Sequence, residues 1–213
     1  MNGPKEGVSA LILAGGRSTR MGQDKAWLPF GGVPLVEHTA RRVSPLVDEL
    51  LFSTDQPVPF EPLLRRLPLP VQVVRDEIPG VGPLAGIAAG LAAAAFDLVL
   101  VLAVDMPFVQ LGLLSHMATL AVDYEAVVPR MGHSTSDELL VEPLHAFYRR
   151  SCLGPISAHL QAGHRRVVSF LPDVRACWIS AAEIARFDPE FMSFRNLNTP
   201  ADWDLATKWL AAK

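Results

Sequence analysis

Apolar residues fall in short runs along the chain, and polar or glycine-rich segments separate these runs. The runs are rich in Val, Leu and Ile, which is typical of strands buried on both faces of a sheet. We therefore predict strands at residues 8–13, 50–53, 71–74, 98–104, 125–129, 144–148 and 175–179. Residues 131–140 are mostly polar, and we predict a loop there.

The segments between these runs contain helix signals. Pro34 and Pro200 can each occupy the first position of a helix, and Asn198 or Thr199 is a suitable N-cap for the second one. We predict helices at residues 34–43, 63–67, 84–95, 108–120, 155–161 and 200–210. Strands that alternate with helices predict an α/β fold, with one doubly wound, mostly parallel sheet, helices on both faces, and a single domain over residues 1–213.

Residues 84–104 are apolar except for Asp97 and have the length of a membrane span. A carboxylate in the middle of a bilayer costs about 2.5 kcal/mol or more. The composition also changes at Asp97, from Ala and Gly to Val and Leu. We therefore expect a buried helix, a turn and a buried strand, and no membrane association.

Overall composition and charge exclude several classes. The net charge of −3 gives no general attraction to nucleic acid. Cys152 and Cys177 are the two cysteines, without metal-ligand spacing, which favours a reduced, cytoplasmic setting. The first ten residues lack the apolar core of a signal peptide. The histidines have no zinc-ligand spacing and no serine lies in a nucleophile elbow, so we expect neither a zinc site nor a serine nucleophile.

The segment from residue 11 to residue 25 has the composition of a strand that leads into a phosphate-binding loop. Glycines allow backbone N–H groups to approach an anion, and basic side chains neutralise it. The glycines are Gly15, Gly16 and Gly22, and the basic residues are Arg17, Arg20 and Lys25. Their spacing fits neither the P-loop nor the dinucleotide-binding motif. The alternative is an ordinary connection with solvated basic residues.

Two acidic residues also follow predicted strands. Asp105 ends the most apolar strand, where its carboxylate could hold a Mg²⁺ ion on phosphate oxygens, although a turn residue before Pro107 is the simpler alternative. Asp76 precedes a second glycine-rich connection and could equally cap a helix or pair with a neighbour. Ligands bind at the carboxyl ends of strands in such sheets, so we expect Lys25, Asp76 and Asp105 near one another.

Five segments of the chain resemble the molybdenum cofactor guanylyltransferases of the MobA type, within the Rossmann-like nucleotidyltransferases. They are Leu-Ala-Gly-Gly-Arg-Ser-Thr-Arg-Met-Gly-Gln-Asp-Lys at 13–25, Gly-Gly-Val-Pro-Leu at 31–35, Gly-Pro-Leu-Ala-Gly at 82–86, Val-Asp-Met-Pro at 104–107 and Asn-Leu-Asn-Thr-Pro at 196–200. The first segment is shared with cytidylyl-transferring and sugar-nucleotide relatives. Gly15-Gly16 and the later segments favour the guanylyl form.

The resemblance implies a role for each matching residue. Those expected to bind the nucleotide are Leu13, Ala14, Gly15, Gly16, Lys25, Ser53, Asp76 and Asp105. Ser53 is a weaker candidate, because the family often has Asn at this position. Asp105 is also expected to bind Mg²⁺ and to act in catalysis with Lys25 and Arg20, and Asn196 and Asn198 are expected on the molybdopterin side.

The implied reaction is GMP transfer from GTP to molybdopterin, which releases pyrophosphate and forms molybdopterin guanine dinucleotide. Mg²⁺ is the implied cofactor, and other proteins of molybdenum cofactor biosynthesis are candidate partners. Two alternatives stay open on the sequence. One keeps the chemistry with CTP or a sugar phosphate as substrate, and the other is a nucleotide-binding regulatory module without turnover.

Overall fold

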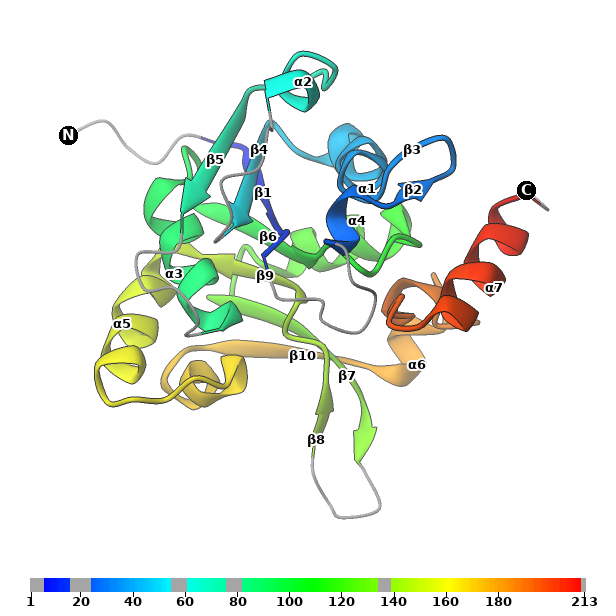
Figure 1. The fold of residues 1–213 in the computed structure, drawn as a ribbon. Coiled ribbons are helices and arrows are strands. Elements are labelled where there is room, and N and C mark those ends of the chain that lie inside the picture. Colours follow the sequence, from blue (N-terminus) through cyan, green and yellow to red (C-terminus); the bar gives the residue numbers. More distant parts are fainter. Residues whose placement is uncertain (1–5, 16–23, 55–60, 76–81, 134–138, 212–213) are drawn as a thin grey trace.

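The computed structural model describes residues 6–15, 24–54, 61–75, 82–133 and 139–211, and a mixed sheet lies at its centre (Figure 1). The spatial order is β10-β7-β9-β6-β1-β4-β5, and β8 pairs with β7. The strands are β1 (Val8–Leu13), β4 (Glu49–Thr54), β5 (Val71–Arg75), β6 (Leu98–Ala103), β7 (Ala126–His133), β8 (Leu139–Val141), β9 (His145–Arg149) and β10 (Ala176–Ser180). A separate small hairpin consists of β2 (Pro29–Phe30) and β3 (Val33–Pro34).

The pairing is parallel over much of the sheet. β1 lies between β4 and β6 and is parallel to both, and β5 continues this arrangement next to β4. β9 is antiparallel to both β6 and β7, so β7 and β10 run in the same direction as β6. The predicted α/β fold with a mostly parallel sheet is confirmed.

Helices cover both faces of the sheet. One face packs with α1 (Leu35–Val43), α4 (Leu111–Leu120) and α7 (Pro200–Ala211), and the other with α3 (Pro83–Ala93) and α5 (Leu153–Gln161). The described residues also form the short helices α2 (Glu61–Leu64) and α6 (Ala181–Ile184). Alternate residues of β6 belong to the two cores, Leu100 and Leu102 to the first and Val99 and Val101 to the second. Successive side chains of a strand point to opposite faces, so β6 lies between two apolar layers.

Three predicted elements need correction. Residues 131–140 were expected as a loop, but β7 continues to His133 and β8 begins at Leu139, while residues 134–138 lie outside the described part. The helix expected from residue 108 begins at Leu111; Phe108 and Val109 are buried outside any helix or strand, and Gln110, the N-cap, has an extended backbone. The helix expected at 63–67 lies at Glu61–Leu64.

The apolar segment from residue 84 to residue 104 divides between α3 and β6, and Asp97 lies in the turn between them. Asp97 forms an ion pair with Arg149 at the end of β9. In the ranges that the structure covers, we find no helix with both the length and the apolar content that crossing a membrane requires.

Gly90 lets α3 pack directly on the central strand. A Cβ atom at this position would lie 2.2 Å from a methyl group of Leu11, which is fully buried in β1. Overpacking in a core costs about 1–3 kcal/mol, more than the ~1 kcal/mol that Ala gains over Gly in a helix. The 2.2 Å approach is far inside van der Waals contact, so we expect the cost to lie toward the upper end of this range and Gly90→Ala to lower the free energy of unfolding in urea by up to ~2 kcal/mol.

Gly112 in α4 provides the matched control. A Cβ there would meet Phe187 at 3.5 Å, an ordinary contact distance. Gly112→Ala should therefore leave the free energy of unfolding unchanged or raise it by up to ~1 kcal/mol. Equal stability of the two variants would contradict the packing argument.

Candidate active site

The order of the strands reverses at β1. From β1 the chain proceeds outward to β4 and β5 and then returns to β6 on the opposite side of β1. Leu13 and Ala103, the last residues of β1 and β6, are register partners. The segments that follow these two strands therefore separate at one edge of the sheet, which is where open α/β sheets bind ligands.

Lys25, Asp105 and Asn198 meet at this edge. Lys25 begins the 3-10 helix η1 (Lys25–Trp27), which Asp24 caps by accepting a hydrogen bond from the Ala26 amide at 3.1 Å. The Lys25 ammonium donates to Asn198 Oδ1 at 2.7 Å and lies 3.4 Å from Asp105 Oδ2. The Lys25 and Asp105 side chains are 17% and 23% exposed, so the pair is accessible to a ligand.

Backbone contacts fix the position of Asn198. The Leu197 amide donates to the Asp105 carbonyl at 2.9 Å, which attaches this segment to the end of β6. Thr199 caps α7 by accepting from the Asp202 amide, while the Asp202 carboxylate accepts from the amides of Asn198 and Thr199. Hydrogen bonds to the Asp202 carboxylate lower its pKa, and those from Thr199 have the largest effect. The start of α7 thus orients the side-chain amide of Asn198 toward Lys25.

The first residues of the expected nucleotide loop are also joined to neighbouring strands. The Ala14 amide donates to the Ser53 carbonyl at 2.9 Å, and the Leu13 carbonyl accepts from the Val104 amide at 3.2 Å. Leu13, Ala14 and Ser53 are buried, whereas Gly15 is exposed. Gly15 therefore follows β1 at the same edge of the sheet at which Asp105 follows β6.

Among the residues that the structure describes, no hydrogen bond or ion pair joins Asn196 to this cluster. Asn196 is half-buried two positions before Asn198. Gly16, Arg20 and Asp76 lie outside the described residues, so their expected roles stay predictions.

Glu142 was not predicted as a site residue, yet it lies close to the cluster. It follows β8, and its amide donates to the Pro129 carbonyl at 3.0 Å. Burial, and secondly the charge of Asp105, raise the pKa of Glu142 to about 7. Glu142 therefore adds a second acidic group on the Asp105 side of the site.

The donor atoms at the site are oxygens of the kind that Mg²⁺ prefers. Across the described ranges no group of three or more His, Cys, Asp or Glu side chains is arranged to hold a metal ion. Mg²⁺ is commonly bound through one or two carboxylates plus substrate phosphates and waters. Asp105, partly exposed at the end of β6, fits that mode of binding.

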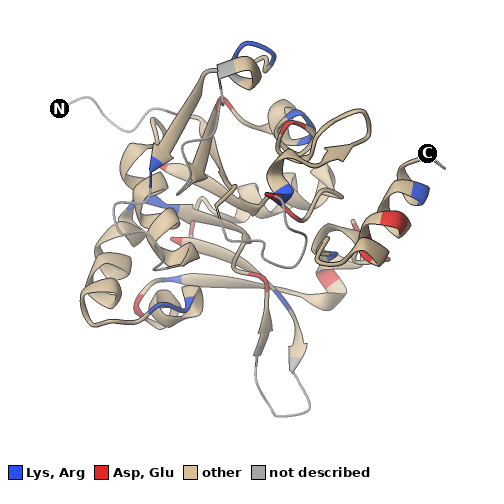
Figure 2. Ribbon diagram, viewed as in Figure 1, with Lys and Arg blue, Asp and Glu red and all other residues tan. Residues whose placement is uncertain are grey.

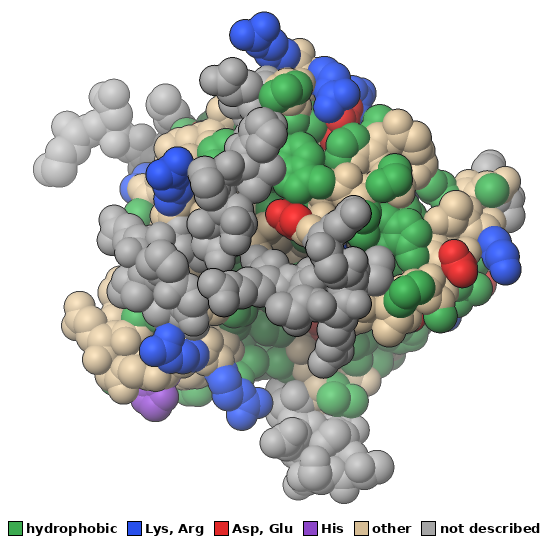
Figure 3. Space-filling model, viewed as in Figure 1, with side chains coloured by type: hydrophobic (Ala, Val, Ile, Leu, Met, Phe, Trp, Pro, Cys, Tyr) green, Lys and Arg blue, Asp and Glu red, His purple; other side chains and the backbone are tan. Residues whose placement is uncertain are grey.

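Charged residues lie mostly outside the central strands (Figure 2). Figure 3 shows basic side chains toward the margins of one face and an acidic side chain nearer its centre. The basic side chains of the described residues on this face are separated from one another.

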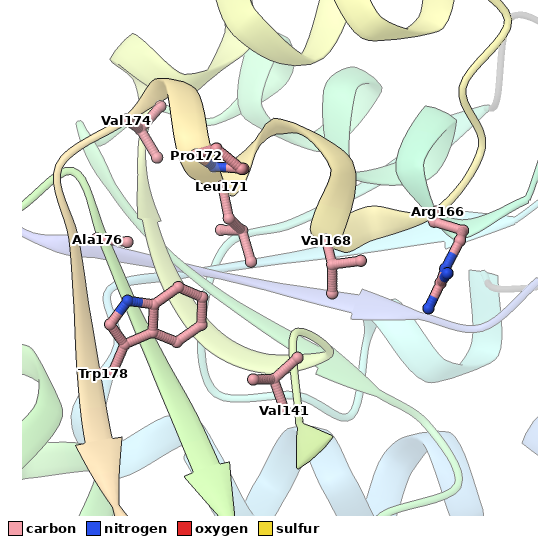
Figure 4. Close-up of a pocket in the computed structure, with 8 residues that line it drawn as sticks. All are labelled: Val141, Arg166, Val168, Leu171, Pro172, Val174, Ala176 and Trp178. Atoms are coloured by element: carbon pink, nitrogen blue, oxygen red, sulfur yellow. The ribbon is translucent and has the colours of Figure 1, made fainter. Parts of the chain in front are cut away.

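A separate pocket of about 540 Å³ lies between β8, β10 and the 3-10 helix η4 (Val167–Asp173) (Figure 4). Trp178 and aliphatic side chains line it, with Arg166 at one end. None of the residues predicted to bind nucleotide or metal contributes to its wall. The pocket is therefore distinct from the Lys25–Asp105 cluster.

His145, at the start of β9, is fully buried, and neither of its ring nitrogens has a hydrogen-bond partner within the described residues. Burial lowers its pKa to about 4, and the charge of Asp188 opposes this effect. The unfolded chain binds a proton near pH 6.5, so the neutral His145 contributes stability above that pH. That stability is lost as the pH falls toward 4.

We therefore expect the free energy of unfolding to fall by up to ~1.4 kcal/mol per pH unit over this range because of His145. His145→Gln should remove this contribution from the pH slope in urea denaturation at a series of pH values. His164→Gln, at an exposed position, should keep the slope of the original chain. An unchanged slope in His145→Gln would contradict the assignment.

A sheet with this strand order, with a lysine and an aspartate in contact at its switch point, defines an α/β protein with a charged site where such sheets bind ligands. Residues 10–175 match the family model described as the MobA-like NTP transferase domain. The chain belongs to this family, which confirms the resemblance stated from the sequence.

Several relatives carry names consistent with this family. A probable molybdenum cofactor guanylyltransferase of Peptoclostridium acidaminophilum is 36% identical, with 93% of this chain and 88% of the relative covered. A molybdenum cofactor guanylyltransferase of Syntrophotalea carbinolica is 35% identical, with 94% and 90% covered.

Solved structures show the same fold. The crystal structure of molybdopterin-guanine dinucleotide biosynthesis protein A from Archaeoglobus fulgidus is similar with a TM-score of 0.77 and 28% identity, covering 96% of this chain and all of that one. A 4-diphosphocytidyl-2C-methyl-D-erythritol synthase from Anaerococcus prevotii has a TM-score of 0.70 at 15% identity, covering 96% and 98%. At that identity the second similarity concerns the fold alone.

Proposed function

We propose that this chain transfers GMP from GTP to molybdopterin, with Mg²⁺ as cofactor. The observation that carries the proposal is the meeting of Lys25, Asp105 and Asn198 at the switch point of the sheet. The names of the relatives support the choice of substrates. The free thiols of Cys152 and Cys177 support a cytoplasmic location.

The proposed reaction is an in-line displacement. An oxygen of the terminal phosphate of molybdopterin attacks the α-phosphorus of GTP, a new P–O bond forms, and the bond to the β-phosphate oxygen breaks, so that pyrophosphate leaves. Both substrates are anions, so positioning and charge neutralisation supply most of the acceleration. No covalent intermediate with the protein is required.

Each residue at the site has a proposed task. Lys25 neutralises charge on the phosphates. Six further residues line the nucleotide: Leu13, Ala14, Gly15, Gly16, Ser53 and Asp76. Asn198 orients Lys25, to which it is hydrogen bonded, and Asn196 and Asn198 face the molybdopterin side. Asp105 would hold Mg²⁺, which when bound neutralises phosphate charge.

Product analysis tests the proposal. Purified chain is incubated with molybdopterin, Mg²⁺ and, in separate samples, GTP, CTP, ATP or UTP. Molybdopterin guanine dinucleotide and an equal amount of pyrophosphate should form with GTP, and removal of divalent ions with EDTA should stop both.

The other outcomes identify the alternatives. Preference for CTP, or for a sugar phosphate in place of molybdopterin, would overturn the substrates and keep the chemistry. Binding of GTP that survives EDTA and yields no pyrophosphate would identify a regulatory module and overturn the enzyme assignment.

A further inference from the structure

Glu142 is attached to the same edge of the sheet as Asp105. β9 is antiparallel to β6, so it begins where β6 ends, and Leu102 is the register partner of His145. The Ala103 amide donates to the Leu144 carbonyl at 2.9 Å. The turn from residue 142 to residue 145 therefore lies alongside the segment that leads to Asp105.

Hydrogen bonds hold this turn in place. The His145 amide donates to the Glu142 carbonyl at 3.1 Å, which closes the turn around Pro143. The hydroxyl of the fully buried Tyr148 donates to the Pro143 carbonyl at 2.8 Å. Together with the Glu142 amide bond to Pro129, these contacts fix the backbone at both ends of the turn. A side chain on such a turn has a defined position.

The charge of Glu142 is not matched. Among the described residues its carboxylate makes no hydrogen bond or ion pair, and Asp105 is the charged group that acts on it. Lys25 is engaged by Asn198 and Asp105. Lys25 balances the charge of Asp105, so any ionised Glu142 adds negative charge that a divalent cation beside it would offset.

We propose that Glu142 positions the divalent cation held by Asp105, acting through a water molecule bound to that ion. Mg²⁺ keeps several of its waters when it binds to proteins, and a carboxylate that accepts a hydrogen bond from such a water orients it. The antiparallel pairing of Ala103 with Leu144 leads to Asp105 on one strand and to Glu142 on the other, so the two residues lie at the same edge of the sheet. This assignment rests on the proposed function, because it uses the same metal site.

The test measures ion binding without turnover. Mn²⁺ replaces Mg²⁺, and the free ion is counted by electron paramagnetic resonance during titration of the full chain with no molybdopterin present. Glu142→Gln keeps the shape of the side chain and removes its charge, and Glu190→Gln does the same at an exposed position. We expect Glu142→Gln to raise the Kd for Mn²⁺ by ~10-fold or more, and Glu190→Gln to leave it unchanged.

Several outcomes decide the matter. A Kd for Glu142→Gln within about twofold of the original chain would overturn the proposal, since outer ligands typically contribute 10-fold or more. Equal Mn²⁺ binding by the original chain and Asp105→Asn would overturn it too, because no ion would then be held at Asp105. Failure of the GTP product assay with the Mn²⁺ difference intact would instead count against the proposed substrates. Thermal melting of each variant separates loss of the ion from loss of the fold.

Discussion

Asp105→Ala should lower kcat/KM for GMP transfer by ~10³-fold while the fold is retained. The carboxylate stands at the end of β6, 3.4 Å from the Lys25 ammonium, and its removal takes away both the proposed Mg²⁺ ligand and the anionic partner of Lys25. Pyrophosphate release at subsaturating GTP measures kcat/KM directly.

The control is Asp123→Ala, at an exposed aspartate after α4. It should keep the original kcat/KM. Both variants should show the far-ultraviolet circular dichroism of the original chain, because the Asp105 side chain lies at the rim of the sheet and not in either core. Full activity of Asp105→Ala would exclude Asp105 from the mechanism.

Lys25→Met should lower kcat/KM by about 10²- to 10³-fold. Methionine keeps much of the length of the side chain but removes the charge that faces the phosphates. If the ammonium acts mainly on charge that develops during transfer, kcat falls with kcat/KM and KM changes little. Initial rates over a range of GTP concentrations separate the two parameters.

Lys208→Met, at an exposed lysine in α7, is the matched control and should be fully active. Lys25 and Asp105 are in contact, so the double variant should lose less than the product of the two single effects. A loss in Lys25→Met confined to KM would show that Lys25 binds the ground state and the transition state equally.

The strands could be predicted because the sheet is buried on both faces. The runs at residues 8–13 and 98–104 are apolar at every position or nearly so, and the structure places β1 and β6 there. The sequence contains no comparable pattern that shows whether a strand runs parallel or antiparallel to its neighbours. An antiparallel β9 within a mostly parallel sheet could not be foreseen from the residues at 144–148.

The hairpin of β7 and β8 was missed for a related reason. Residues 131–140 have a polar composition, which normally indicates a loop. The last residues of β7, Gly132 and His133, nevertheless pair with β8. Strands without an apolar layer on each face show no apolar run.

The proximity of Lys25 and Asp105 could be predicted because its signals were local. Glycines and basic residues after β1, and an aspartate after β6, pointed to one edge, and the structure brings Lys25 and Asp105 together there. Glu142 precedes a strand, and only an antiparallel strand begins at the edge where its parallel neighbours end.

Asn198 is 173 residues away from Lys25 along the chain, and its contact with Lys25 has a consequence for biosynthesis. Ribosomes add about 5–20 residues per second, so Asn198 is synthesised roughly 10 to 35 s after Lys25. During that interval β1, β4, β5 and β6 can already pair in the nascent chain. The emerging protein would thus have its sheet before it has a complete pocket, and turnover would begin only once the Asn198 segment has docked on Asp105.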